Sequence, residues 1–230
     1  MNDVLGQALL DYFNHDVGQK LWIHNTYGKK EEMPVKTYFR EVNEMPDLEL
    51  IALQNCRGKV LDIGAGAGSH SLELQSKGFD VTALEISANA VEVMNRRGVE
   101  KIIQEDIFSF EKDKFDTLLL LMNGIGLTAN MPGLERFLEH AKNLINLAGQ
   151  LIFDSSDIAY LYDHKIPKMS NYYGEISYSY QYKKQKTDWF TWLYIDQQTL
   201  LATAAKIGWN AEILFIDEYD QYLAKLWLKD

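Results

Sequence analysis

The chain has 230 residues, of which 47% are hydrophobic and 24% are charged, enough for one α/β domain around a single core. Its 23 basic and 33 acidic side chains give a formal net charge of -10 at pH 7, which disfavours attraction to nucleic acid or to an anionic membrane. One cysteine, Cys56, cannot form an internal disulfide, and we expect neither a signal peptide nor a membrane-spanning segment. These features predict a cytoplasmic protein.

The first 57 residues are expected to form a helical segment ahead of the sheet. Apolar side chains recur at helical spacing from Asp3 to about Asp16, and a second helix is predicted around Pro46 to Asn55. The sequence between them is aromatic and rich in turn residues.

A short apolar strand is predicted from Lys59 to Ile63, followed by alternating glycines and then a helix from Ser69. The three glycines of this turn are Gly64, Gly66 and Gly68. Glycine can take positive φ and lets the backbone approach a bound group, and the start of the following helix offers unpaired N–H donors. The pattern therefore predicts a ligand-binding turn.

The spacing of the turn argues against a dinucleotide. That fingerprint requires a glycine three places after the second one, and counting from Gly66 this place holds Ser69. In addition, Asp62 directly precedes Ile63 and the first glycine, where a carboxylate would repel a pyrophosphate but would tolerate an amino acid ammonium. An adenosine cofactor without phosphate is favoured.

The run from Val60 to Gly68 resembles the first motif of the class I S-adenosylmethionine-dependent methyltransferases. The resemblance implies a Rossmann-like, doubly wound, mainly parallel seven-stranded sheet with an antiparallel C-terminal strand. It implies S-adenosyl-L-methionine as the cofactor, and the cofactor-binding residues that it suggests in this stretch are Asp62, Gly64, Ala65, Gly66 and Gly68.

In such methyltransferases, the segment before the first strand commonly closes over the cofactor. The group Tyr38-Phe39-Arg40 resembles such a lid. Tyr38 would then lie near the sulfonium or the methionine moiety, and Arg40 would pair with the methionine carboxylate. The alternative is a surface arginine beside two core aromatic residues.

A second predicted strand ends in Glu85, followed by Ile86 and by a helix from about Ala88 to Arg97. Because carboxyl ends of parallel strands meet at one edge of a sheet, Glu85 would reach the ribose and accept from both sugar hydroxyls. We expect Ile86, its neighbour, to contact the cofactor as well.

The next predicted strand spans Val99 to Ile103, and acidic residues follow it where the methyltransferase fold holds the adenine. The resemblance assigns the exocyclic amine to Asp106 and a ring nitrogen to the backbone N–H of Ile107. Glu105 is a rival for the acidic role.

An almost continuous apolar run from Phe115 to Met122 predicts a central parallel strand, and Asn123 follows it. Methyl donor and acceptor meet at this strand end in the family. Asn123 is therefore a candidate for binding the cofactor's amino acid end or the acceptor, with a simple turn role as the alternative. Enzymes that methylate nucleic-acid amines often carry an Asn/Asp-Pro-Pro-Tyr/Phe motif here, which this chain lacks.

Further elements complete the predicted sheet: a helix from Pro132 to Leu147, a strand from Gln150 to Asp154, and a helix from Asp196 to Lys206 ahead of two final strands around Asp220. An inserted antiparallel hairpin is predicted between Gly174 and Ile195. Three roles are open for this hairpin: a roof over the acceptor pocket, a homodimer contact, or an aromatic platform for bases. We favour the first.

We predict one class I methyltransferase domain over 1–230. Its expected parts are an N-terminal helical lid (1–57), a cofactor-binding core (58–170), the inserted hairpin (171–195) and a C-terminal helix and hairpin (196–230). The expected activity is methyl transfer from S-adenosylmethionine to a small-molecule acceptor by in-line displacement, with no metal and no assigned catalytic residue. The alternatives are an NAD-dependent oxidoreductase, a non-catalytic S-adenosylmethionine-binding interaction protein and, last, a nucleic-acid methyltransferase.

Overall fold

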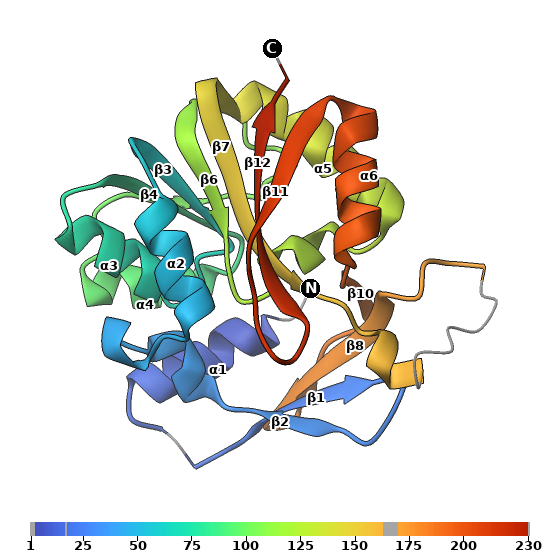
Figure 1. Cartoon of the computed structure of the whole chain (residues 1–230). Helices are drawn as coiled ribbons and strands as arrows, with labels where there is room; N and C mark the ends of the chain where they lie inside the picture. The colour runs from blue at the N-terminus through green and yellow to red at the C-terminus, as the bar shows by residue number, and fades with distance from the viewer. Residues whose placement is uncertain (1–2, 17, 163–169, 230) are drawn as a thin grey trace. The chain divides into compact units, whose positions relative to one another are not determined.

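The structure is a computed structural model that describes residues 3–16, 18–162 and 170–229. Its larger sheet has seven strands, which in spatial order are β11 (Trp209–Ile216), β12 (Gln221–Leu228), β7 (Ile145–Ser156), β6 (Phe115–Leu120), β3 (Lys59–Ile63), β4 (Asp80–Glu85) and β5 (Ile102–Gln104) (Figure 1). Strands β4 and β5 pair in parallel, as do β6 and β7, whereas β12 runs antiparallel to both β7 and β11. The predicted Rossmann-like, mainly parallel sheet with an antiparallel C-terminal strand is confirmed.

A second sheet was only partly predicted. Its strands are β10 (Phe190–Leu193), β8 (Glu175–Tyr182), β1 (Leu21–Asn25) and β2 (Glu31–Met33) in that order, with β9 (Gln185–Lys186) also paired with β8. The predicted hairpin is therefore present, but its strand β8 also pairs antiparallel with β1, from Leu21 opposite Tyr182 to Asn25 opposite Tyr178.

Strands β1 and β2 correct the expectation that the first 57 residues are helical. Strand β1 has the sequence Leu-Trp-Ile-His-Asn, in which apolar and polar side chains do not alternate, so the pattern that identifies a half-buried strand is missing. Its partner β8 lies far along the chain: His24 of β1 and Gln181 of β8, whose side chains are hydrogen-bonded, are 157 positions apart. Pairing over such a distance leaves no local signal in the sequence.

The chain divides into two compact units. Unit 1 contains the residues up to Met45, Asp62–Ser109 and Ser177–Phe190. Unit 2 contains Pro46–Leu61, Phe110–Ile176 and Thr191–Asp230. The predicted single-domain organisation stays a prediction.

The helices of unit 1 are α1 (Val4–Phe13), η1 (Val35–Phe39), η2 (Val42–Glu44), α3 (Ser69–Ser76) and α4 (Ala88–Arg97), where η marks a 3-10 helix. Asp3 caps α1, since its Oδ1 accepts the Gly6 N–H at 3.0 Å. Helix α1 packs on α4 through a buried cluster that includes Leu9 and Val93 and also Ala67. The glycine turn and α1 therefore share one apolar core.

The helices of unit 2 are α2 (Asp47–Asn55), η3 (Gly124–Thr128), α5 (Met131–Leu144), η4 (Ala159–Tyr162) and α6 (Gln197–Ile207). Helix α6 runs beside β11 (Figure 1). The buried Trp209 of β11 donates its indole N–H to the Leu138 carbonyl of α5 at 3.1 Å. Leu118, Leu119 and Leu120 of β6 are fully buried, as expected for a central strand.

In the described parts of the chain, no helix has the length and hydropathy needed to cross a membrane. The same residues contain no group of three or more His, Cys, Asp or Glu side chains arranged to hold a metal ion.

Candidate functional site

The glycine turn of unit 1 joins the end of β3 to the start of α3. Gly64 has a φ of 72° and Gly68 a φ of 82°, in the left-handed region that favours glycine. A Cβ built on Gly68 would lie 2.8 Å from Cγ2 of Val99, so this position also has no room for a side chain. A Cβ on Gly64, by contrast, would have no atom within 4 Å, so the backbone of Gly64 is open to close approach by a ligand.

Glu85, at the end of β4, is hydrogen-bonded to the glycine turn. Its Oε2 accepts the N–H of Gly66 at 2.9 Å, and its Oε1 accepts the N–H groups of Ile86 at 2.8 Å and Ser87 at 2.9 Å. Burial raises the pKa of Glu85, although these three hydrogen bonds oppose the shift. A carboxylate has about four acceptor positions, so one remains on Oε2.

The residues predicted to bind adenine lie beside the end of β4. The N–H of Glu105 donates to the carbonyl of Glu85 at 3.1 Å, which brings the segment after β5 next to this strand. Asp106 is exposed, and its Oδ1 accepts the N–H of Phe108 at 2.9 Å. Ile86 is 66% exposed, whereas Ile107 is buried. Ile86 therefore offers an uncovered apolar surface beside the Glu85 carboxylate.

Asp62 is only 2% exposed, and its Oδ2 accepts the hydroxyl of Ser71 at 2.6 Å. Burial raises the pKa of Asp62, and the neighbouring His70 and the Ser71 hydrogen bond oppose that shift. The acid before the first glycine is thus bound to the first turn of α3. Its expected role toward an ammonium stays a prediction.

Tyr38 lies against the glycine turn. A Cβ on Gly66 would be 3.3 Å from Cδ1 of the Tyr38 ring, and the Ser69 hydroxyl donates to the Tyr38 carbonyl at 2.9 Å. Arg40 follows η1 directly and is half-buried. The structure thus brings Tyr38 to the glycine turn, and the roles assigned to Tyr38 and Arg40 toward the cofactor stay predictions.

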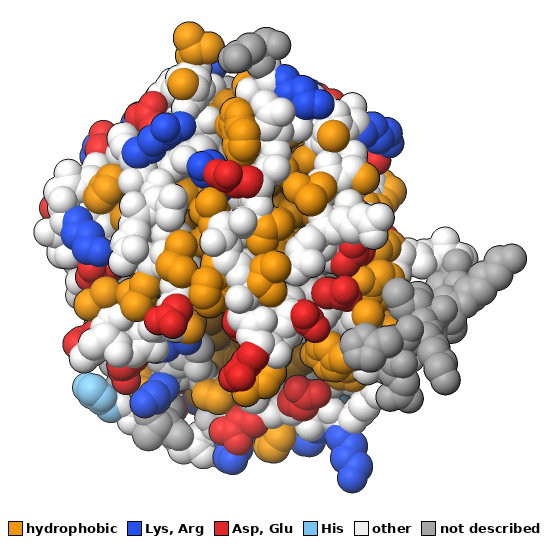
Figure 2. Space-filling model, viewed as in Figure 1, with side chains coloured by type: hydrophobic (Ala, Val, Ile, Leu, Met, Phe, Trp, Pro, Cys, Tyr) orange, Lys and Arg blue, Asp and Glu red, His pale blue; other side chains and the backbone are white. Residues whose placement is uncertain are grey.

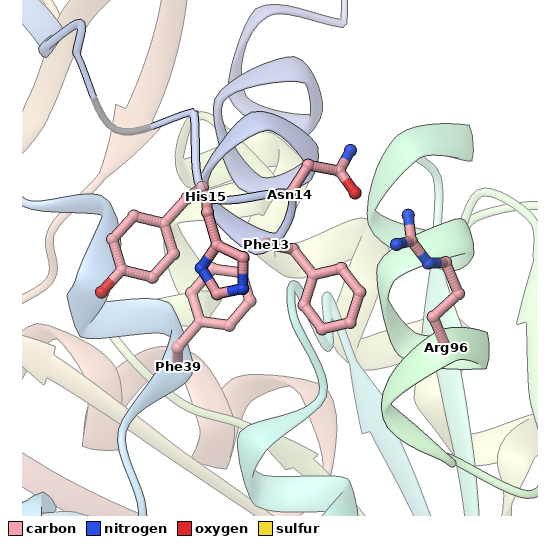
Figure 3. Close-up of a pocket in the computed structure, with 6 residues that line it drawn as sticks. Phe13, Asn14, His15, Phe39 and Arg96 are labelled. Atoms are coloured by element: carbon pink, nitrogen blue, oxygen red, sulfur yellow. The ribbon is translucent and has the colours of Figure 1, made fainter.

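A hollow of about 580 Å³ opens at the C-terminal end of α1. The residues that line it are Tyr12, Phe13, Asn14, His15, Phe39 and Arg96 (Figure 3). None of the predicted cofactor residues is among them. The Phe39 ring lies 4.8 Å from that of Tyr12 and 6.4 Å from that of Phe13, centroid to centroid. The aromatic wall of this hollow therefore anchors η1, the helix that carries Tyr38.

In unit 2, a tight turn follows β6. Met122 and Asn123 have φ values of 60° and 59°, which are unusual for residues other than glycine. The Asn123 N–H donates to both carboxylate oxygens of Asp154 at 2.8 Å, and the Trp192 indole N–H donates to the Asn123 carbonyl at 3.1 Å. The main chain of Asn123 is therefore held from both sides.

Within the part of the chain that the structure describes, the side-chain amide of Asn123 lacks the hydrogen bonds that its main chain makes. Its Oδ1 and Nδ2 atoms are buried, and neither has a hydrogen-bond partner among the described residues. Buried polar atoms are normally paired, because leaving one unpaired costs about 1–3 kcal/mol. The amide thus offers a donor and an acceptor to a bound molecule, which suits either ligand role that the sequence suggested.

Neither Asp154 nor Trp192 was predicted from the sequence to be functional. Asp154 is fully buried on β7 and also accepts from the Gln221 side chain at 2.9 Å. Burial raises its pKa to about 6, and the charge of Glu49 adds to the shift. An acid ending an apolar strand was a usable signal for Asp154, whereas nothing in the sequence separated Trp192 from the other aromatic residues of the hairpin.

The family of the chain follows from its similarity to known proteins. Residues 55–199 match the family model described as a methyltransferase domain, which covers more than half of the chain. The chain belongs to this methyltransferase family. The resemblance drawn from the glycine turn is thereby confirmed.

A methyltransferase of known structure covers nearly the whole chain. The S-adenosylmethionine-dependent methyltransferase of Bacteroides fragilis, crystallised with S-adenosyl-L-homocysteine, is 39% identical, with a TM-score of 0.91. The match covers 99% of this chain and 95% of that one. A methyltransferase from Clostridium acetobutylicum, 13% identical with a TM-score of 0.59, matches over 79% of this chain and 88% of its own, and shares the fold alone.

A curated relative of the chain carries two small amines in its name. Glycine/sarcosine N-methyltransferase of Halorhodospira halochloris is 28% identical over 123 residues, which are 50% of this chain and 46% of the relative. The chain therefore spans about half the length of the curated relative that it matches.

Proposed function

We propose that this protein transfers a methyl group from S-adenosyl-L-methionine to a small-molecule acceptor. The observation that carries the proposal is the 2.9 Å hydrogen bond from the Gly66 N–H to Glu85, which joins the acid after β4 to the glycine turn after β3. The methyltransferase that is 39% identical was crystallised with S-adenosyl-L-homocysteine, which supports the same cofactor here.

The described residues of unit 1 fit the adenosine part of this cofactor. In our proposal, the remaining acceptor position on Oε2 of Glu85 takes a ribose hydroxyl, and a second hydroxyl would have to share an oxygen already in use. The exposed Ile86 covers one face of the adenine, Asp106 accepts from its exocyclic amine, and the Ile107 N–H donates to a ring nitrogen.

The remaining assignments concern the amino acid end of the cofactor. Tyr38, beside Gly66, would lie near the methionine moiety, and Arg40 would pair with its carboxylate. Asp62 would attract the ammonium through its negative charge. Asn123 would bind the cofactor's amino acid end or the acceptor through its unpaired amide.

The bound cofactor supplies a methyl carbon that its sulfonium has already activated. The chain therefore needs no covalent nucleophile, and its residues act by holding and aligning the two reactants. Alignment at about 3–3.5 Å contributes several kcal/mol to such a reaction. A general base is required only where the acceptor carries a hydroxyl or a protonated amine.

We propose a small amine as the acceptor. The curated relative is named for two small amines, glycine and sarcosine, and the Asn123 amide oxygen can accept from an amine N–H. A nucleic acid is disfavoured by the net charge of -10. On the face seen in Figure 2, the Lys and Arg side chains of the described residues are scattered among acidic ones. A cytoplasmic location remains part of the proposal, as does the role of the hairpin as a roof over the acceptor pocket, with a homodimer contact as the alternative.

Isothermal titration calorimetry tests the cofactor. We expect S-adenosylhomocysteine to bind and NAD to give no heat beyond the buffer control. Binding of NAD in place of S-adenosylhomocysteine would favour the oxidoreductase alternative.

A second assay tests catalysis with glycine, sarcosine and a panel of other small amines, by measuring S-adenosylhomocysteine formed from S-adenosylmethionine. We expect turnover with at least one amine. Cofactor binding without turnover on any acceptor would favour the non-catalytic interaction protein.

A further inference from the structure

Arg97, in the last turn of α4, contacts both ends of the junction between the glycine turn and α3. Its Nη1 donates to the Ala67 carbonyl at 2.6 Å and to the Ser69 hydroxyl oxygen at 3.1 Å. Ala67 precedes the last glycine of the turn, and Ser69 begins α3. One guanidinium therefore spans the end of the glycine turn, and hydrogen bonds from a charged donor are the stronger kind.

The same side chain also reaches the segment that carries Tyr38. The Cζ of Arg97 lies 5.1 Å from the centre of the Phe39 ring, a cation–π distance, and Glu41 interacts electrostatically with its charge. Ser69 completes the connection, because its hydroxyl donates to the Tyr38 carbonyl at 2.9 Å. Arg97 thus bridges the glycine turn and the residues 38–41.

The adjacent Arg96 makes none of these contacts. It is exposed, stacks on Phe13 at 4.7 Å and lies 3.5 Å from Glu92 on its own helix. Arg97 is half-buried, and this burial lowers its pKa against the opposing effect of Glu41. The two arginines lie in the same helical turn but differ in exposure and in partners, and only Arg97 joins the glycine turn to η1.

We propose that Arg97 is a positioning residue for the cofactor, holding η1 and its Tyr38 closed on the glycine turn. The part of this inference that names S-adenosylhomocysteine as the ligand rests on the proposed function. The contact between η1 and the turn does not depend on it. Without Arg97, η1 separates from the turn more often and a bound nucleoside leaves faster.

The ligand-free protein gives the first test. Hydrogen exchange of the segment 35–41 and the rate of trypsin cleavage after Lys36 and Arg40 both measure how often η1 opens. We expect both to rise about tenfold in Arg97→Leu, the loss expected for a charged hydrogen bond. Arg96→Leu is the control: it keeps the ring contacts of Phe39 with Tyr12 and Phe13, so exchange and cleavage should stay within about twofold of the wild type. Equal opening in Arg97→Leu and Arg96→Leu would overturn the inference.

Release of S-adenosylhomocysteine gives the second test, by stopped-flow displacement. We expect the dissociation rate to rise about tenfold in Arg97→Leu while the association rate stays within about threefold. Arg97→Lys keeps the charge but lacks the planar fork, so it should restore part of the slow release. Ser69→Ala, which removes the link to the Tyr38 carbonyl, should accelerate release less than Arg97→Leu.

The two proposals can fail separately. If the wild-type protein does not bind S-adenosylhomocysteine, the proposed function is wrong, and hydrogen exchange in the ligand-free chain still decides the role of Arg97. If the wild type binds but Arg97→Leu releases the ligand at the same rate, the positioning role is wrong. Should Arg97→Leu fail to fold, Arg97→Lys decides the same question, because it removes the guanidinium that lies over Phe39 and donates to Ala67 and Ser69, and unchanged exchange and release in that variant would refute the positioning role.

Discussion

The two units each contain a left-handed turn at the end of a strand, and the turns use their polar groups in opposite ways. In unit 1, the side chain of Glu85 is occupied by the protein itself, since it accepts three backbone N–H groups. In unit 2, the main chain of Asn123 is occupied, by Asp154 and Trp192, and its side-chain amide has no partner among the described residues.

The difference shows two routes to a prepared polar site. Glycines give the turn of unit 1 its left-handed backbone without steric cost, so its acid can fix the loop and keep one acceptor position. The turn of unit 2 uses Met122 and Asn123, and the left-handed conformation costs roughly 1–2 kcal/mol for a residue such as Met122 and less for an asparagine. The paired contact with Asp154 offsets part of this cost and leaves the amide unpaired.

The largest expected effect is that of Glu85→Gln. One amide oxygen cannot replace two carboxylate oxygens, and the amide donor would face the Gly66 N–H. We expect the Kd for S-adenosylhomocysteine to rise roughly 100-fold and the free energy of unfolding to fall by about 1–3 kcal/mol. Calorimetry measures the Kd, and urea titration measures the free energy of unfolding. Glu92→Gln, on the exposed side of α4, is the control, and an unchanged Kd in Glu85→Gln would refute the ribose assignment.

Asp154→Asn tests the clamp in unit 2 through its pH dependence. The folded-state pKa of about 6 exceeds the ordinary 3.8, so the folded chain binds more protons and loses stability as pH rises from about 4 to 6. We therefore compare the free energy of unfolding of Asp154→Asn with that of the wild type by urea titration. The value for the variant minus that for the wild type should be about 2 kcal/mol more positive at pH 7.5 than at pH 4. A difference that does not change with pH would show that Asp154 keeps an ordinary pKa.

Gly126→Ala tests the contact of Trp192 with the turn of unit 2. A Cβ at this position would lie 1.9 Å from the indole Nε1, so the ring would have to move away from the Asn123 carbonyl. We expect a loss of about 1–3 kcal/mol in the free energy of unfolding, measured by urea titration. The loss should shrink in a Trp192→Leu background, and an equal loss there would place the clash elsewhere.

The smallest expected change in stability is that of Asn123→Gly, which sharpens the contrast with Glu85. Glycine keeps the left-handed backbone and removes an amide without a partner, so we expect the free energy of unfolding to change by less than about 1 kcal/mol. Methyl transfer should nevertheless fall about tenfold. A large loss of stability would mean that the amide has a structural partner after all.

Much of the fold and part of the site could be predicted from the sequence. The strand before Gly64, the run from Phe115 and the strand ending in Glu85 each carry their signal in adjacent residues. Parallel strand ends meet at one edge, so the link between Glu85 and the glycine turn followed from strand order. The hydrophobic pattern of each strand and the order of the strands along the chain were enough for these predictions, because both can be read from neighbouring residues.

Tertiary structure alone decided which distant groups complete each turn. Asp154 lies 31 positions from Asn123, and Trp192 lies 69 positions from it. Arg97 likewise donates to the carbonyl of Ala67, 30 positions earlier in the chain, and strand β1 pairs with β8, which lies much later in the chain. Periodicity reports which face of an element is buried, and it carries no information about which residue from another element will lie opposite. That choice depends on how the elements pack.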